Sequence, residues 1–462
     1  MTIAVEQSEV FRWASELGVP DALIEAATQA ERASAEEREG VRRRAQNNQL
    51  KVMRAFAAVG WGEGHFSGST GYGYHDTGRE ALDETVARVF GAEAACVRWN
   101  LVSGTHALSS LLFGILRPGD TCVSVTGAPY DTLKPVLYGD KGSLEEWGVH
   151  FEVVALAADG TPDVEACVAA VRRPEVKVVY VQRSCGYDWR PSLDVEAMGN
   201  LITRMKQASP QLVVLVDNCY GEMVEAREPT QLGADCLAGS LIKNLGGTLA
   251  PTGGYVAGRK DLVEAAQIAM TAPGICGHQG ATLDITRTLA QGLFMSPMIV
   301  GQALEGAVWA AHLFERLGFD VSPRPGQPRT DIIQALRLGT RQRLAAFCRG
   351  VQAAGPIDAR AVPQPVMNPG YRDPIIMAGG SFIAGSSMEL SADGPLREPF
   401  AVYLQGGISY VHVQMGVMLA LREHVATSSS LRASSTRPDK CQTRRRTRMR
   451  FCFSHCREFS SR

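Results

Sequence analysis

Between residues 94 and 258, short valine-rich runs alternate with helical segments, and this alternation constrains the fold more than any other feature of the chain. The clearest runs, "VKVVYVQRS" and "QLVVLVDNCYG", are continuously apolar rather than alternately apolar and polar. Strands of that kind are typical of a parallel sheet that helices cover on both faces. The sequence therefore predicts an α/β fold whose large domain holds a mostly parallel, doubly wound sheet.

The rest of the chain divides around this region. Residues 1–60 are expected to form a helical segment, and the large domain is expected to occupy residues 61–299. Residues 300–425 combine a long helix, strand-like pieces such as "AVYLQGGIS" and a last helix, which predicts a smaller α+β domain. Residues 426–462 are rich in Ser and Arg and have almost no apolar period, so disorder is expected there.

The composition excludes several classes of protein. The 462 residues are 45% hydrophobic and 21% charged, which is ordinary for a soluble globular chain, and the net charge is −1. Residues 426–462 alone carry ten Lys or Arg against two acidic residues. Such a run can bind nucleic-acid phosphates, but it is more often a solvated extension. We therefore expect no nucleic-acid partner.

The sequence also argues against secretion, a membrane partner and a metal site. The start, "MTIAVEQSEVFRWASEL", lacks the features of a secretory signal, and no apolar run approaches the ~20 residues that span a bilayer. Eleven scattered cysteines form no C-x-x-C motif, which favours reduced thiols and a cytoplasmic location. Cys452, His455 and Cys456 have no evident fourth ligand, so no metal is expected.

Three groups of polar residues fall where strands of the predicted sheet end. Asp217 ends the run "QLVVLVDN", and Lys243 follows the run "CLAGSLI". The sequence "SGT" at residues 103–105 follows "AACVRWNLV" and opens a helix. Ligands of doubly wound sheets bind beyond the carboxyl ends of the strands. We therefore expect these three groups to face one site.

Pyridoxal phosphate needs all three groups. Its aldehyde needs a lysine amine, which Lys243 can supply, and its ring nitrogen needs a carboxylate, which Asp217 can supply. Its phosphate needs the N–H groups of a helix N-terminus, as at residues 103–105. Ser240 can donate its hydroxyl to the phosphate, and Tyr130 in "TGAPYDT" can stack on the ring. The predicted cofactor-binding set is Ser103, Gly104, Thr105, Tyr130, Asp217, Ser240 and Lys243.

Each of these residues taken alone has a plainer explanation. A single lysine is usually solvated, and a single aspartate often caps a turn. Any helix can begin with Ser-Gly-Thr, and a tyrosine such as Tyr130 also packs in loops. The interpretation depends on the combination, because Lys243, Asp217 and the "SGT" turn all lie at strand ends.

The motifs resemble the fold-type I pyridoxal-phosphate enzymes and, within them, the cystathionine lyase/methionine γ-lyase superfamily. The segments "VSGTHAL", "VDNCYGE", "AGSLIKN" and "SSMELSADGPLREP" are similar in particular to its methionine γ-lyase-like, or aluminium-resistance, branch. The resemblance spans roughly residues 9–425. It implies that Lys243 is the Schiff-base lysine, that Asp217 pairs with the pyridinium and that Tyr130 covers the ring. It also implies a homodimer or homotetramer in which Tyr72 reaches the phosphate of a neighbouring subunit.

The sequence departs from this pattern at two places. The better-known lyases have Tyr-x-Arg where this chain has "GYGYH", so Tyr74 stands at the position of the arginine, and Arg79 is a nearby alternative. The arginine that binds the substrate carboxylate is not at a recognisable family motif. Arg397 in "GPLREP" is the first candidate for that role and Arg183 is the second.

The resemblance implies a lyase that acts on a small-molecule amino acid. Lys243, with a pKa lowered by burial, removes the Cα proton, and a sulfur leaving group departs by β- or γ-elimination. The products are a 2-oxo acid and ammonia. Two alternatives stay open from the residues alone. One is an aminotransferase or another fold-type I enzyme, and the other is a cofactor-binding stress or metal-tolerance protein with little turnover.

Overall fold

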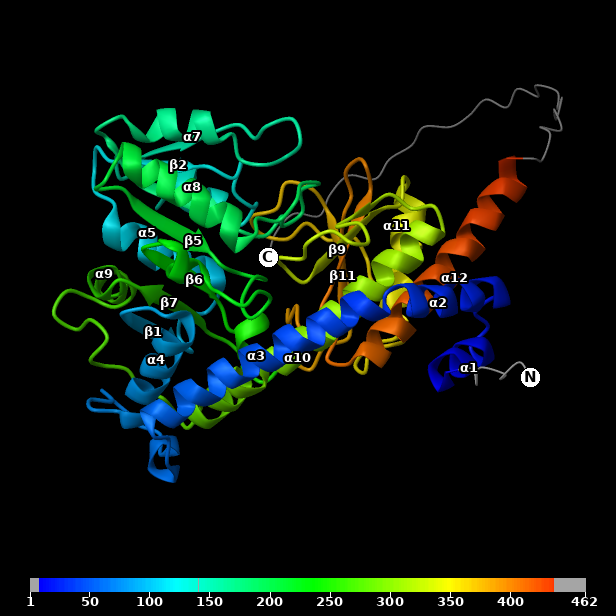
Figure 1. Cartoon of the computed structure of the whole chain (residues 1–462), viewed down its shortest axis with the longest axis horizontal. Helices are drawn as coiled ribbons and strands as arrows, with labels where there is room; N and C mark the ends of the chain where they lie inside the picture. Colours follow the sequence, from blue (N-terminus) through cyan, green and yellow to red (C-terminus); the bar gives the residue numbers. More distant parts are fainter. Residues whose placement is uncertain (1–7, 140, 436–462) are drawn as a thin grey trace, which may run out of the picture.

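The structure is a computed structural model that describes residues 8–139 and 141–435 (Figure 1). Its larger sheet is made of β1 (Ala94–Arg98), β2 (Thr121–Ser124), β3 (His150–Val153), β4 (Val176–Gln182), β5 (Val213–Asp217), β6 (Cys236–Ser240) and β7 (Gly254–Gly258). The strand order is β1-β7-β6-β5-β4-β2-β3. Strands β3, β2, β4, β5 and β6 pair in parallel, and β7 pairs antiparallel with β6 and β1. The prediction of a mostly parallel sheet is confirmed.

Both faces of this sheet are buried, as the continuous apolar strands predict. In β4, Val179 and Val181 pack into the core on one face, whereas Val178 and Tyr180 pack into the core on the other. The helices of the region are α4 (Thr77–Phe90), α5 (Gly104–Ile115), α6 (Lys134–Tyr138), α7 (Val164–Val171), α8 (Val195–Ala208) and α9 (Lys260–Met270). Side chains of α4 and α8 belong to the first core, and those of α5 and α9 belong to the second.

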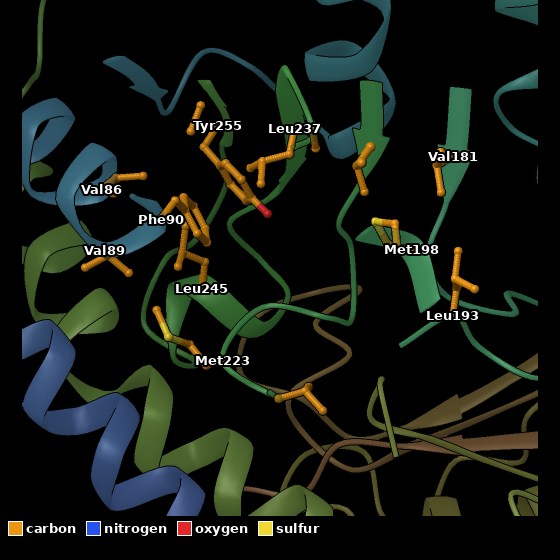
Figure 2. Close-up of a cluster of buried hydrophobic side chains, with 14 of the residues drawn as sticks. Val86, Val89, Phe90, Val181, Leu193, Met198, Met223, Leu237, Leu245 and Tyr255 are labelled. Atoms are coloured by element: carbon orange, nitrogen blue, oxygen red, sulfur yellow. The ribbon is translucent and has the colours of Figure 1, made fainter. Parts of the chain in front are cut away.

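Figure 2 shows how helices and strands meet in the first of these cores. Phe90 of α4 stacks on Tyr255 of β7, with ring centroids 5.3 Å apart. Met198 of α8 and Val181 of β4 belong to the same cluster. This packing fixes the carboxyl ends of the central strands, where the predicted site residues lie.

The smaller sheet is antiparallel throughout. Its strands are β8 (Val321–Ser322), β9 (Ile333–Arg337), β10 (Ile375–Gly379), β11 (Ser391–Pro395) and β12 (Ala401–Gln405), in the order β10-β11-β12-β9-β8. Helices α11 (Arg341–Ala353) and α12 (Tyr410–Ser435) pack on each other, and α11 packs on β10 and β11. Helix α12 continues to Ser435, so the first part of the segment expected to be disordered is helical. The rest of that segment, 436–462, lies outside the described residues.

The N-terminal helices join the two sheets. They are α1 (Glu9–Glu16), α2 (Asp21–Ala33) and α3 (Ala35–Val59), and α3 runs beside the long α10 (Thr286–Arg316) (Figure 1). The expected domain boundary at residue 300 falls inside α10. One-turn helices η1 (Glu63–Phe66), η2 (Pro229–Leu232) and η3 (Asn244–Gly246) complete the fold. The described residues contain no helix long and apolar enough to cross a membrane.

Candidate active site

A cavity of about 220 Å³ lies where the carboxyl ends of β4, β5 and β6 meet the smaller sheet. The last residues of these three strands, Gln182, Asp217 and Ser240, line it, and so does Ile333, the first residue of β9. The cavity therefore occupies the position where doubly wound sheets bind their ligands. Seven residues predicted to bind the cofactor line it: Ser103, Gly104, Thr105, Tyr130, Asp217, Ser240 and Lys243. Tyr72, which the resemblance adds to the predicted cofactor-binding residues, does not line this cavity.

Asp217 is a buried carboxylate with defined partners. One oxygen, Oδ1, accepts a hydrogen bond from the backbone N–H of Cys219 at 3.1 Å, and Oδ2 accepts one from the Tyr180 hydroxyl at 3.3 Å. Burial raises the pKa of Asp217, and the positive charge of Lys243 opposes that shift. The fold thus fixes the carboxylate in a setting where it can interact with a cation in the cavity.

Lys243 lies three residues beyond the end of β6, immediately before η3. Its Nζ is 4.1 Å from the centroid of the Tyr220 ring. Burial lowers the pKa of Lys243, but the acidic groups of Cys219, Tyr220 and Asp217 raise it by more, so the net pKa lies well above the usual lysine value. Burial thus acts in the expected direction, but in the chain without its cofactor the acidic groups of the cavity outweigh it, so the expected net lowering of this pKa is not found.

The N-terminus of α5 forms an anion cradle in the same cavity. Ser103 caps the helix, and its Oγ accepts from the backbone N–H of His106 at 3.1 Å. The N–H groups of Gly104 and Thr105 have no intrahelical acceptor, as in the first turn of any helix. A Cβ at position 104 would lie 3.2 Å from Cys219 Sγ and from Ser240 Cβ, so glycine allows the helix to approach β6 closely.

Tyr130 connects this cradle to the neighbouring strand. Its backbone N–H donates to Gln182 Oε1 at 2.9 Å, and its hydroxyl is 3.1 Å from Thr105 Oγ1. Burial, with the nearby negative charge of Asp217, raises the pKa of Tyr130 well above the usual tyrosine value. The phenol therefore stays protonated at neutral pH and can act as a hydrogen-bond donor.

The two candidate arginines have different surroundings. Arg183 is 0% exposed and does not line the cavity. Its guanidinium donates to Asn218 Oδ1 at 2.7 Å and to Gly221 O at 2.9 Å, and it pairs with Glu225 at 2.6 Å. These bonds stabilise the turn after β5. Because Arg183 is fully buried outside the cavity lining, the structure gives no support to a substrate-binding role for it.

Arg397 lies close to two residues that line the cavity. Its Nη2 donates to the backbone oxygen of Tyr187 at 3.2 Å, and its Nη1 is 3.7 Å from Asp131 Oδ2. Asp373 at 3.3 Å and Asp188 at 4.0 Å also pair with it. Arg397 is therefore held beside the cavity among three carboxylates, and its role in binding a substrate stays a prediction.

Residues of the glycine-rich loop before α4, which contains the sequence "GYGYH", do not line the cavity of the same chain. Tyr72 is 73% exposed, and its backbone oxygen accepts from the N–H of Gly280 at 2.8 Å. Arg79 is buried and donates to the backbone oxygens of Gly280 at 2.6 Å and His278 at 3.3 Å. Arg79 thus anchors a loop of its own chain, and the structure does not support it as a substitute phosphate clamp.

Several cavity-lining residues were not among the predicted site residues: Asp131, Thr132, Gln182, Ser184, Gly186, Tyr187, Cys219, Tyr220, Ile242, Ile333 and Tyr371. Gln182 ends a strand, so its position alone could have indicated it. Tyr187 and Cys219 follow strand ends within a few residues. Ile333 and Tyr371 come from the smaller sheet and a loop beside it, and no local signal connects them to the cavity.

Metal chemistry receives no support from the described part of the chain. Among residues 8–139 and 141–435, no group of three or more His, Cys, Asp or Glu side chains could hold a metal ion. The possible ligands Cys452, His455 and Cys456 lie outside the described residues.

Comparison with known proteins identifies the family. The family model for methionine gamma-lyase matches residues 23–425. The chain belongs to the methionine gamma-lyase family. An uncharacterized member, the protein YnbB of Bacillus subtilis (strain 168), is 45% identical over 380 residues, which are 81% of this chain and 90% of that protein. The L-methionine gamma-lyase of Pseudomonas putida is 28% identical over 233 residues, 49% of this chain and 54% of that enzyme.

Two solved structures are similar in fold to this chain. A carbon-sulfur lyase involved in aluminum resistance from Clostridium novyi NT superposes with a TM-score of 0.85 at 41% identity, covering 89% of this chain and 98% of that chain. The pyridoxal-5'-phosphate dependent protein YhfS from Escherichia coli superposes with a TM-score of 0.57 at 19% identity, covering 83% of this chain and 96% of that chain, a likeness of fold alone. The predicted fold-type I architecture and the resemblance to the aluminium-resistance branch are confirmed.

Proposed function

We propose that the protein is a pyridoxal-phosphate-dependent carbon–sulfur lyase that releases a sulfur leaving group, a 2-oxo acid and ammonia from a sulfur amino acid. The observation that carries the proposal is the convergence of Lys243, Asp217 and the N-terminus of α5 in one cavity of about 220 Å³. Membership of the methionine gamma-lyase family supports the same reaction class.

The residues of the cavity fit this cofactor in three respects. The free N–H groups at the start of α5 and the hydroxyl of Ser240 suit a phosphate. Gly104 leaves room for the helix terminus to approach β6, because a Cβ there would contact Cys219 and Ser240 at 3.2 Å. The buried carboxylate of Asp217 suits the protonated ring nitrogen, and the phenol of Tyr130 suits the face of the ring.

When bound, pyridoxal phosphate supplies an aldehyde that reacts with amines and a ring that accepts electrons from the substrate Cα. Lys243 Nζ is the amine that would bond the aldehyde and, once free, move a proton at Cα. The acidic groups around Lys243 raise its pKa and oppose loss of its proton. The positive charge of a protonated cofactor ring beside Asp217 would offset these acidic groups. The unprotonated, basic form of Lys243 is therefore favoured only when the cofactor is bound.

Tyr130 and Asp217 have separate roles in this scheme. Asp217 holds a proton on the ring nitrogen, because a buried carboxylate is stabilised by a cation at hydrogen-bond distance. Tyr130 keeps its own proton, since its pKa is raised by burial and by the charge of Asp217. It can therefore orient the ring by stacking and donate a hydrogen bond during elimination.

The first test is the visible absorbance of the purified protein with pyridoxal phosphate, compared with Lys243→Ala and with Lys177→Ala, an exposed lysine on β4, as the control. We expect an absorbance band in the native and Lys177→Ala proteins and none in Lys243→Ala. L-methionine, L-cystathionine and L-cysteine are then supplied, and ammonia and 2-oxo acid are measured. Without a band in the native protein, the assignment of Lys243 and its cavity is wrong.

The same experiment separates the alternatives. A band without ammonia release contradicts the lyase and favours an aminotransferase or a cofactor-binding protein with little turnover. Conversion of the cofactor to its amine form without ammonia identifies the aminotransferase.

We further propose a cytoplasmic homodimer or homotetramer. The high exposure of Tyr72, away from the cavity of its own chain, supports a role at the site of a neighbouring copy. Light scattering of the eluted protein measures the assembly, and a monomer with full activity contradicts this proposal.

A further inference from the structure

Tyr187 is a cavity-lining residue that the smaller sheet holds in place. It belongs to the loop that follows β4, yet its hydroxyl donates to Asp393 Oδ2 of β11 at 2.7 Å. Its backbone oxygen accepts from the Tyr403 hydroxyl of β12 at 2.6 Å and from Arg397 Nη2 at 3.2 Å. The hydroxyl and the backbone oxygen of Tyr187 are therefore both held by residues of the β11–β12 hairpin and its turn.

The ring of Tyr187 forms part of an aromatic wall. Its centroid lies 6.2 Å from that of Tyr371, which also lines the cavity, and 5.4 Å from that of Tyr403. The residues suited to the cofactor all come from the large-sheet half of the chain, whereas Tyr371 and Ile333 come from the segments of the smaller sheet. The wall of Tyr187, Tyr371 and Ile333 is therefore the part of the cavity lining that the smaller sheet and its loops form or hold in place.

Asp393 acts on the cavity through Tyr187. The carboxylate is buried, and its Oδ2 also accepts from Gln405 Nε2 at 2.8 Å. Among the described residues, no Lys, Arg or His forms an ion pair with it. Asp393 does not line the cavity itself. Its contact with the cavity is indirect, because its carboxylate holds the phenol of Tyr187 in place.

We propose that Tyr187 is the specificity-determining residue that contacts the substrate's side chain, and that Asp393 is its positioning residue. Sulfur packs well against aromatic rings, so the ring of Tyr187 suits the side chain of a sulfur amino acid. This inference rests on the proposed function.

The test compares Tyr187→Phe, Asp393→Ala and the double variant with the native holoenzyme on S-methyl, S-ethyl and S-butyl thioethers of L-cysteine and L-homocysteine. We expect KM for the S-methyl substrates to rise roughly threefold to tenfold, the effect of one lost hydrogen bond, with kcat within about twofold. The double variant resembles the single ones, since the residues act as one unit. Tyr187→Ala shifts the preference towards the S-butyl substrates.

Tyr410→Phe is the matched control, because Tyr410 also donates its hydroxyl to a carboxylate, that of Glu31, and does not line the cavity. We expect Tyr410→Phe to leave the preference of the protein among the thioethers unchanged. Unfolding temperature and cofactor absorbance are measured for every variant. If Asp393→Ala fails to fold, the two Tyr187 variants still decide the outcome.

Calorimetric titration of the same thioethers measures their binding preference whether or not ammonia is released. Native protein that binds thioethers without releasing ammonia contradicts the proposed lyase but not the role of Tyr187. Release of ammonia together with an unchanged preference in Tyr187→Phe and Tyr187→Ala overturns the inference and leaves the lyase standing.

Discussion

At the scale of single residues, Glu222 stands out as a carboxylic acid that is completely buried. It is fully buried, and its Oε1 accepts from the Tyr255 hydroxyl at 2.6 Å. The pKa of Glu222 is raised from 4.5 to about 8, chiefly by burial and in addition by the charge of Glu228. The hydrogen bond from Tyr255 and the charge of Lys243 lower the pKa and so oppose this shift. Glu222 is therefore mostly neutral at pH 7.

The raised pKa predicts how stability depends on pH. The folded protein holds the Glu222 proton between pH 4.5 and about 8 whereas the unfolded chain releases it, so the free energy of unfolding falls as pH rises through this window. Glu222→Gln keeps the shape and removes the titration. We expect its unfolding temperature to match that of the native protein near pH 5 and to exceed it by several degrees near pH 9. A constant difference across this range contradicts the prediction.

At the scale of the elements, glycines inside helices differ in how closely neighbouring atoms approach them. In α11, a Cβ at Gly350 would lie 2.3 Å from the Cα of Ala420 in α12. In α3, a Cβ at Gly40 would have Arg44 Nη1 as its nearest neighbour, at 3.8 Å. The same residue type thus has a packing function in one helix and none in the other.

Replacing each of these glycines by alanine separates helix propensity from packing. Gly350→Ala must push α11 and α12 apart, and we expect it to lower the free energy of unfolding by about 1–3 kcal/mol. Gly40→Ala has room for its methyl group and is expected to be neutral or to stabilise by up to ~1 kcal/mol. Urea unfolding of both variants measures the two effects, and equal effects would show that packing at Gly350 is not tight.

For the whole molecule, the two ends of the chain share one core. Phe11 of α1 is 2% exposed and belongs to the same cluster as the strands of the smaller sheet and α12. Its ring stacks on Trp309 of α10, with centroids 6.5 Å apart. Helix α1 is therefore part of the core of the smaller sheet, although more than 300 residues of sequence separate it from β8.

This shared core predicts a large effect from a residue far from the cavity. Phe11→Ala removes a buried ring and is expected to lower the free energy of unfolding by about 3–5 kcal/mol. Trp13→Ala on the same helix is the control, because Trp13 is 54% exposed and its loss should change stability little. Denaturant unfolding compares the two. Similar values for both variants contradict the packing of α1 in this core.

The sequence by itself determined the parallel sheet and the residues that meet beyond its strands. Continuous valine runs require burial on both faces, and the polar residues that follow them come together because parallel strands end at one edge. Ser103, Asp217 and Lys243 could therefore be placed near one another from local patterns alone, and they line one cavity.

Only the tertiary structure decided the surroundings of other residues. Arg183 and Arg397 are both arginines near a loop in sequence, yet Arg183 is buried with Glu225 whereas Arg397 lies beside the cavity. Asp393 meets Tyr187 across 206 residues of sequence. Such pairs form between segments that only the tertiary fold brings together, and no periodicity within either segment encodes which side chains face each other.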